Sequence, residues 1–338
     1  MGFAQLKIQG SFLKKSPLFK SRKIFRSERN TIMIDADDLH GSTDPVRWME
    51  TVSNGMGQGT DRLPSYMDLF YLWERQQWSV ADLDFSTDRE HWNTDTDPVL
   101  RRQRLFGYVQ FFNGEISVTN ALVPFVNAMP SLDQRIYVTT QLADEAKHSV
   151  FFDRWFTDVL RADREVIGVQ LKEYHDYQHP FAQYLLNELL PEVSGAIDKT
   201  PENLELLVEG VTLYHLIIEG TLSIASQARI LKRCKQAAVF PGFVKGMTAL
   251  ARDESRHILF GLRFLRDMVR SNPRYADRMM GMVNRLLPGI IELAVPPKEF
   301  FSFMVASGED PAYLKKFYVN SLKRHIGAIG IDFSISIP

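Results

Sequence analysis

Two short segments of this sequence repeat one arrangement of residues that can bind a metal. Residues 144–148 are Asp-Glu-Ala-Lys-His, and residues 253–257 are Asp-Glu-Ser-Arg-His. In a helix, a Glu and a His three positions apart lie on one face, so each segment can direct a carboxylate oxygen and an imidazole nitrogen to the same point. Each segment therefore supplies half of a metal site.

The repetition makes the motif informative. With 8 histidines in 338 residues, chance alone gives roughly 0.4 Glu-x-x-His pairs, so a single pair would mean little. Here there are two, and each follows another glutamate placed inside an apolar segment. The pattern of Glu followed by Glu-x-x-His therefore occurs twice. It predicts six ligands: Glu115, Glu145, His148, Glu219, Glu254 and His257.

Helices must position these ligands, because the periodicity from Pro64 onward is helical and no alternating strand pattern is convincing. In the four segments that carry the ligands, apolar residues recur three and four positions from each ligand, so the ligands lie on the buried stripe. These segments are residues 99–127, the helix that Ser131 opens as a cap, and residues 202–232 and 243–270. Flanking helices are expected over residues 65–77, 164–190, 274–294 and 311–325, with a polar loop over 82–97 and a break at Pro191.

This pattern predicts an all-α fold, a ferritin-like four-helix bundle with additional flanking helices and a dimetal carboxylate site in its core. Four buried carboxylates facing one another would be prohibitively costly unless they were protonated or paired with cations. Two divalent metals would cancel their charge, and oxygen-rich ligation with one His per metal suits iron or manganese better than structural zinc. The competing interpretation is that these are surface Glu–His pairs or satisfied core polar residues.

Composition excludes some classes of protein. A formal charge of −1 gives no signal for nucleic-acid binding, and no run approaches the length of a membrane-spanning helix. The single cysteine, Cys234, rules out an internal disulfide and agrees with a cytoplasmic location. Residues 1–60 are expected to form a basic, flexible arm and a Gly-rich hinge, and residues 61–338 the helical domain.

From about Pro64 to the C-terminus, the chain resembles the ribonucleotide reductase small-subunit superfamily, and most closely the R2-like ligand-binding oxidases. The radical-carrying reductase subunits usually have a tyrosine four residues after the first motif His, where this chain has Phe152, and commonly begin the ligand set with Asp, where it has Glu115. The oxidases have a Val three residues after the first Glu and a Tyr five residues before the third-helix Glu. Val118 and Tyr214 stand at those positions.

The resemblance implies an O2-activating oxidase with a mixed manganese and iron site. The ligand residues accept both metals, so a site with two irons is the alternative. Manganese would lie on the side of Glu115, Glu145 and His148, and iron on the side of Glu219, Glu254 and His257. It also implies a Tyr–Val ether crosslink, a bound long-chain fatty acid whose carboxylate reaches the metals, and a homodimer. On a regular helix Tyr214 lies about 140° around from Glu219, so its approach to the site requires a local distortion such as a π-bulge.

Three residues have supporting roles in this interpretation. Asp144 and Asp253 could accept the free N–H of a ligand histidine, although an acid beside a ligand can also be merely solvated. His215, four residues before Glu219, is expected in the core or behind the ligands and not as a seventh ligand.

Two alternative functions from other classes of protein remain open. One is a reductase small subunit that generates a radical for a partner, and the other is a ferritin-like protein that binds metal or lipid without catalysis.

Overall fold

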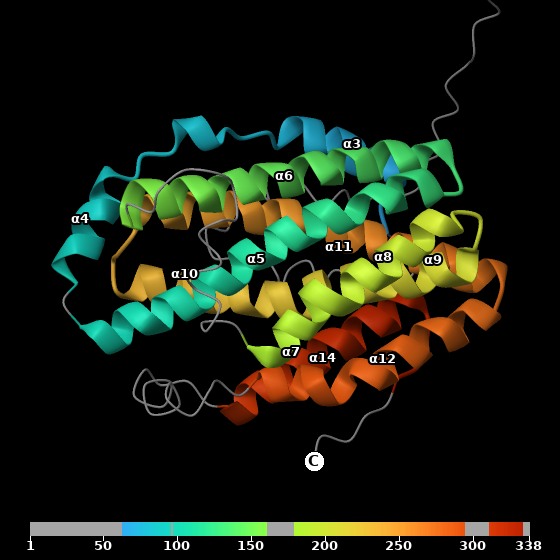
Figure 1. The fold of residues 1–338 in the computed structure, drawn as a ribbon. Coiled ribbons are helices and arrows are strands. Elements are labelled where there is room, and N and C mark those ends of the chain that lie inside the picture. Colours follow the sequence, from blue (N-terminus) through green and yellow to red (C-terminus); the bar gives the residue numbers. More distant parts are fainter. Residues whose placement is uncertain (1–62, 96, 161–178, 295–310, 334–338) are drawn as a thin grey trace, which may run out of the picture. The chain divides into compact units, whose positions relative to one another are not determined.

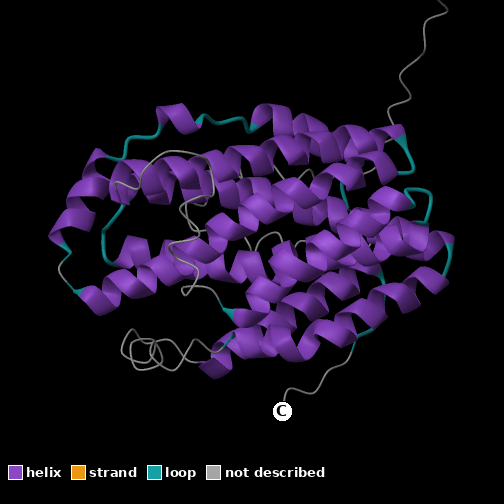
Figure 2. Cartoon of the chain, viewed as in Figure 1, coloured by secondary structure: helices purple, strands orange, loops and turns teal. Residues whose placement is uncertain are grey.

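Helices position every ligand predicted from the sequence. A computed structural model describes residues 63–95, 97–160, 179–294 and 311–333, and these residues contain no strand (Figure 2). They all belong to one compact unit that spans residues 42–338. The basic arm and hinge expected over residues 1–60 lie outside the described residues.

Four helical runs carry the two motifs and the two preceding glutamates. Helix α5 packs against α6, and α11 packs against η5 and α10 (Figure 1). The third run is continuous through three segments and has π-helical geometry in the middle. The runs are α5 (Pro98–Ala128), α6 (Leu132–Leu160), α9 (Leu204–Val211) with η5 (Thr212–Ser223) and α10 (Ile224–Gln236), and α11 (Pro241–Ser271).

Shorter elements cover this bundle. Helix α8 packs on α5, α3 on α6, and α12 and α14 on η5 (Figure 1). Their bounds are α3 Tyr66–Arg75, η1 Val80–Asp82, α4 Ser86–Thr94, α7 Pro180–Gln183, η4 Tyr184–Leu189, α8 Leu190–Lys199, α12 Arg274–Leu293 and α14 Pro311–Ile329.

Polar caps determine where the long helices begin. Asp97 accepts hydrogen bonds from the backbone N–H groups of Val99 and Leu100, and Pro98 follows it at the first position of α5, where its missing N–H costs nothing. Ser131 and Gln134 cap α6 reciprocally, since the Ser131 hydroxyl accepts from the Gln134 N–H and the Gln134 side chain accepts from the Ser131 N–H. The predicted cap at Ser131 is confirmed.

Two local expectations are wrong. The segment expected to be a polar loop over 82–97 contains α4, whose buried Asp88 accepts hydrogen bonds from the N–H groups of Gly242 and Phe243 and so caps α11. Pro191 does not end a helix, because it lies at the start of α8 directly after the π-helical η4, and the chain remains helical through Lys199. The predicted residues 164–178 of that helix lie outside the described part of the chain.

The run Leu204–Gln236 is long and apolar enough to cross a membrane by length and composition alone. In the structure, 83% of its most apolar window is buried. It also carries Glu219 into the bundle interior, where Glu219 is only 3% exposed. We therefore interpret this run as a core helix of the bundle.

Candidate metal centre

The structure brings the six predicted ligand residues together in the bundle interior. Each is at most 4% exposed. The Nδ1 atom of His148 lies 3.3 Å from a carboxylate oxygen of Glu115 and 3.4 Å from one of Glu145. The Nδ1 atom of His257 lies 3.1 Å from Glu145, 3.5 Å from Glu219 and 3.4 Å from Glu254.

These atoms form two overlapping groups, each with ligand atoms within 4.8 Å of one another. One group is Glu115, Glu145, His148 and Glu254, and the other is Glu145, Glu219, Glu254 and His257. Glu145 and Glu254 belong to both groups, so each could contribute to holding either of two cations. Four carboxylates with two histidines match the donor set of dimetal carboxylate bundles.

Unsatisfied polar atoms indicate what the cluster lacks. Each of the six residues has one buried oxygen or nitrogen without a hydrogen-bond partner. Buried polar atoms are almost always satisfied, because leaving one unpaired costs about 1–3 kcal/mol. Two cations would satisfy all six atoms and neutralise the four carboxylates, so the residues present fit a dimetal group.

Burial also shifts the ionisation of these groups. Desolvation raises the pKa of Glu115 and Glu219 well above the ordinary value for Glu, and it also raises the pKa of Glu254. Burial acts on Glu145 in the same direction, but the Nδ1 atoms of His148 and His257, which lie close to its carboxylate, hold its pKa well below that value. Without cations, the cluster therefore retains protons on several carboxyls, which a bound metal would displace.

The two aspartates hold the histidines in a crossed arrangement. His148 Nε2 lies 3.3 Å from Oδ2 of Asp253, and His257 Nε2 lies 3.3 Å from Oδ2 of Asp144, so each aspartate serves the histidine of the other motif. A carboxylate at Nε2 favours the tautomer that is protonated there, which leaves Nδ1 as the ligand atom that faces the cluster.

A buried arginine links the two aspartates. The Arg256 guanidinium donates to Asp144 over 2.8 Å and to Asp253 over 2.6 Å. Two indoles complete the shell, since Trp73 donates to Asp144 and Trp78 to Asp253. Sequence reasoning missed these three residues. The signal for Arg256 was present, because both motifs place a basic residue directly before the His.

The π-helical geometry of η5 turns Tyr214 toward the site. The hydrogen bonds of a π-helix join residues five apart and its turn is wider than that of an α-helix, so Tyr214 and Glu219 lie near one face, unlike in a regular helix. The Tyr214 hydroxyl donates to Glu145 Oε1 over 2.8 Å and accepts from Gln141 Nε2 over 3.1 Å. Val118, which is 5% exposed, belongs to the same apolar cluster as Tyr214.

Two other predicted positions lie beside the cluster. His215 is within hydrogen-bond distance of Gln141 Oε1 at 3.0 Å, and burial lowers its pKa to about 3, so it is neutral and belongs to neither ligand group. Phe152 stacks parallel to Phe111 with ring centroids 6.2 Å apart, inside an aromatic cluster.

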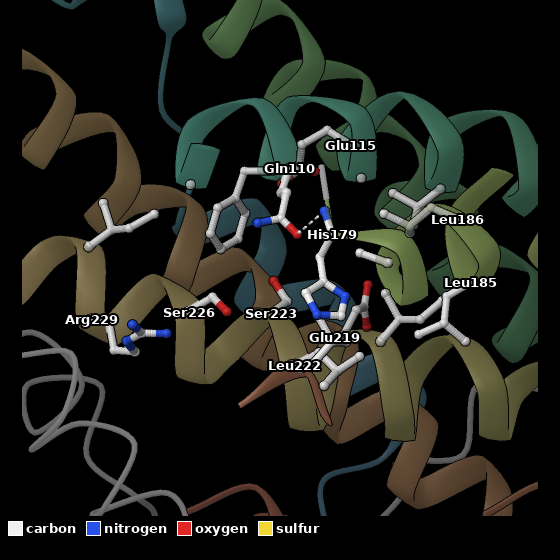
Figure 3. Close-up of a pocket in the computed structure, with 18 of the residues that line it drawn as sticks. Gln110, Glu115, His179, Leu185, Leu186, Glu219, Leu222, Ser223, Ser226 and Arg229 are labelled. Carbon is white, nitrogen blue, oxygen red and sulfur yellow. Dashed lines mark hydrogen bonds between the residues drawn. The ribbon is translucent and has the colours of Figure 1, made fainter. Parts of the chain in front are cut away.

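A cavity of about 190 Å³ extends from the cluster and includes Val118 in its lining. Figure 3 shows Glu115 and Glu219 at one part of this cavity, with Ser223 at the end of η5 and Ser226 and Arg229 of α10 leading away from them. His179 also lines this cavity and lies near Gln110 and Ser223 (Figure 3). Its Nδ1 accepts from the Phe181 N–H, and burial lowers its pKa, so the neutral ring carries its proton on Nε2.

Comparison with known proteins identifies the fold. No protein-family model matches the chain. An R2-like ligand-binding oxidase with valine replaced by isoleucine and an anaerobically reconstituted Mn/Fe cofactor superposes with a TM-score of 0.68 at 23% identity, over 79% of this chain and 94% of that one. A glycine-to-leucine variant of the same kind gives a TM-score of 0.69 at 24% identity, with the same shares covered.

An R2-like ligand-binding oxidase with aerobically reconstituted Mn/Fe cofactor gives a similar result. Its TM-score is 0.69 at 24% identity, over 78% of this chain and 92% of that one. The agreement covers nearly the whole length of these structures. It confirms the expected all-α, ferritin-like fold.

Proposed function

We propose that this protein is an O2-activating dimetal oxidase related to the R2-like ligand-binding oxidases, with manganese and iron as its metals. The observation that carries the proposal is the pair of overlapping ligand groups, in which all six residues retain an unsatisfied buried atom. Manganese would be held by Glu115, Glu145 and His148, and iron by Glu219, Glu254 and His257. When bound, the metals supply the redox chemistry that reduces O2.

The protein residues have distinct tasks in this proposal. Asp144 and Asp253 fix the two histidines, and Gln141 donates to both Tyr214 and Glu219, which aligns the phenol with the ligand set. The surrounding apolar cluster excludes water from the oxidising centre. The phenol donates a hydrogen bond to Glu145, so this carboxylate can accept the phenol proton when the phenol oxygen reacts.

Val118 and Tyr214 are the proposed pair for an ether crosslink. The link joins the Tyr214 oxygen to Cβ of Val118, removes one hydrogen from each residue, and uses O2 as the oxidant. Cβ of valine carries a tertiary C–H, which is weaker than that of a methylene. The glycine and the valine replaced in two of the similar structures lie four positions apart in that protein, as Gly114 and Val118 do here.

We further propose that the cavity beside Val118 holds a long-chain fatty acid or a similar lipid, and that the protein is a cytoplasmic homodimer. The cavity lining is apolar over much of its length, which suits an alkyl chain. A radical-generating reductase subunit is disfavoured, because Phe152 carries no hydroxyl and packs among Phe111 and Phe112.

Peptide mass spectrometry tests the proposed oxidase activity. The protein is loaded with Mn²⁺ and Fe²⁺ without oxygen, and its peptides are analysed before and after exposure to air. We expect air to join the peptides that carry Val118 and Tyr214, with the loss of two hydrogens.

The Tyr214→Phe variant should form no link, whereas Tyr137→Phe, which alters another buried tyrosine, should form it normally. Metal binding without a link in the wild-type protein would contradict the oxidase proposal. That result would favour metal storage or radical generation.

A further inference from the structure

A buried histidine in the wall of the cavity has a hydrogen-bond donor that the described residues leave unused. His179 is 8% exposed and lines the cavity. Its Nδ1 accepts from the Phe181 N–H over 3.2 Å, so the neutral ring carries its proton on Nε2. Among the residues that the structure describes, none accepts a hydrogen bond from Nε2, and this atom is not sealed from accessible space. The Nε2 proton therefore faces the cavity.

The chain fixes the direction of this donor. The His179 backbone N–H donates to Gln110 Oε1 over 3.4 Å, and Gln110 Nε2 donates to the Phe106 carbonyl over 3.2 Å. His179 also caps α7 through Nδ1, and Pro180 follows it at the first position of that helix. The ring is thus held in place before a ligand binds, which reduces the entropy cost of a contact with Nε2.

A serine hydroxyl lies beside the His179 ring. Figure 3 shows Ser223, the last residue of η5, near this ring, and both residues line the cavity. Ser223 Oγ accepts from Gln227 Nε2 over 2.9 Å, and a hydroxyl has one donor and a second lone pair besides. No described residue accepts a hydrogen bond from the Ser223 hydroxyl. The two side chains together offer two donors and one acceptor to a ligand.

The cavity wall near this polar pair also contains apolar side chains. Leu185 and Leu186 of η4 and Leu222 of η5 line the same cavity (Figure 3). A plain alkyl chain at this point would cover both donors without satisfying them, which is unfavourable for a buried polar group. A ligand with an oxygen atom at this point would satisfy them.

The place of the pair along the cavity sets where that oxygen must be. Ser223 follows Glu219 by four residues, which is about 6 Å of helix. Gln110, which holds the His179 backbone, precedes Glu115 by five residues, or about 7.5 Å. With bonds of about 1.5 Å and angles of about 111°, an extended chain advances about 1.25 Å per bond. The oxygen therefore belongs near the sixth carbon of an acid whose carboxylate reaches the metals.

We infer that the ligand of this cavity is a fatty acid with a hydroxyl near its sixth carbon, which His179 and Ser223 bind. The hydroxyl accepts from the His179 Nε2–H and donates to the free lone pair of Ser223 Oγ. The inference rests on the proposed function for the orientation of the acid, and it names the class of that ligand. The two side chains themselves bind the hydroxyl without a metal.

Calorimetric titration with three acids of equal length tests the inference. The probes are dodecanoate, 6-hydroxydodecanoate and 12-hydroxydodecanoate, and each is titrated into protein loaded with Mn²⁺ without oxygen. We expect the 6-hydroxy acid to bind about five- to tenfold more tightly than the other two, because it satisfies a buried donor. In metal-free protein its preference over dodecanoate should persist, because the polar pair uses no metal.

Two substitutions separate the Nε2 donor of His179 from its role as a helix cap. His179→Asn keeps a side chain that can cap α7 but is shorter than imidazole, and His179→Phe keeps a ring but has no donor. In both variants the affinity for 6-hydroxydodecanoate should fall to within about twofold of that for dodecanoate. Ser223→Ala should reduce the preference about two- to fourfold.

Ser226→Ala is the matched control, because it removes a serine hydroxyl that lines the same cavity three residues farther along the helical run. It should keep the full preference for the 6-hydroxy acid. Equal affinities of the wild type for dodecanoate and 6-hydroxydodecanoate would overturn the inference, since water would then satisfy the donors equally well. Failure of all three acids to bind, or a preference that both His179 variants retain, would also overturn it.

The air-dependent Val118–Tyr214 link is measured on the same batch of wild-type protein, which separates the two proposals. Absence of the link together with a clear preference for the 6-hydroxy acid contradicts the oxidase function alone. A link that forms in air, together with equal affinities for dodecanoate and 6-hydroxydodecanoate, contradicts this inference alone. The comparison of probes on the wild type decides the matter even if a variant fails to fold.

Discussion

Arg256 is buried between two carboxylates that come from different helices. Its guanidinium is 1% exposed and donates to Asp144 of α6 and Asp253 of α11, which in turn hold His257 and His148. Removing one member of a buried ionic group leaves the others desolvated and unpaired. One side chain therefore maintains the geometry behind both histidines.

We predict that Arg256→Met lowers the free energy of unfolding by about 3–5 kcal/mol, because two buried aspartates lose their shared cation. Arg263→Met on the same helix should cost only about 0.2–1 kcal/mol, since the Arg263–Asp267 pair is partly exposed. Urea denaturation of the two metal-free variants measures both values. Equal losses would show that the buried network contributes no more than a surface pair.

At the scale of the elements, the distorted run η5 is fitted closely to α11. A Cβ placed on Gly261 of α11 would lie 2.2 Å from Cβ of His215, which is far inside contact distance. His215 directly follows Tyr214 in the π-helical segment. The small residue at position 261 therefore allows α11 to approach the element that carries Tyr214 and Glu219.

Gly261→Ala should therefore destabilise the protein by about 1–3 kcal/mol, because α11 or η5 must shift to admit a methyl group. Gly281→Ala in α12 provides the control, since no atom lies within 4 Å of the added Cβ and alanine favours helix by about 1 kcal/mol. Thermal unfolding should place the two variants on opposite sides of the wild type. A neutral Gly261→Ala variant would refute the close fit.

At the scale of the molecule, the ligand cluster joins four helical runs that lie far apart in the sequence. Glu115 comes from α5, Glu145 from α6, Glu219 from η5 and Glu254 from α11. Burial raises the pKa of Glu115, Glu219 and Glu254, so these groups hold protons that cations must displace. Metal binding should therefore cross-link the bundle and depend on pH.

Saturating Mn²⁺ or Fe²⁺ without oxygen should raise the melting temperature by about 5–10 °C. The reason is that a ligand at a hundredfold excess over its Kd stabilises the folded state by about 2.7 kcal/mol. The sign of the pH dependence follows from the raised pKa values. Protonation competes with the metal, so the increment should grow as pH rises and shrink as it falls. Scanning calorimetry with and without a chelator measures this rise in melting temperature. In the Glu219→Gln variant the rise should be smaller than in the wild type at every pH.

Much of the fold was predictable because the ligand residues lie on apolar stripes with helical spacing. The four ligand-bearing runs and the all-α ferritin-like class follow from that periodicity. The helix over α4 was missed, since its polar sequence contains no stripe and its buried Asp88 is recognised only through the α11 N-terminus that it caps. The prediction that Pro191 ends a helix was also wrong. Pro191 lies in the first turn of α8, directly after the π-helical η4, and the chain stays helical there.

The sequence by itself determined which six side chains could share a site, since spacing along a helix fixes which residues lie on one face. The tertiary structure decided how those faces meet. It placed Glu145 and Glu254 in both ligand groups, crossed Asp144 and Asp253 to the opposite histidines, and turned Tyr214 inward through a π-helical run. These features depend on contacts between residues that are far apart in the chain, which local periodicity does not encode.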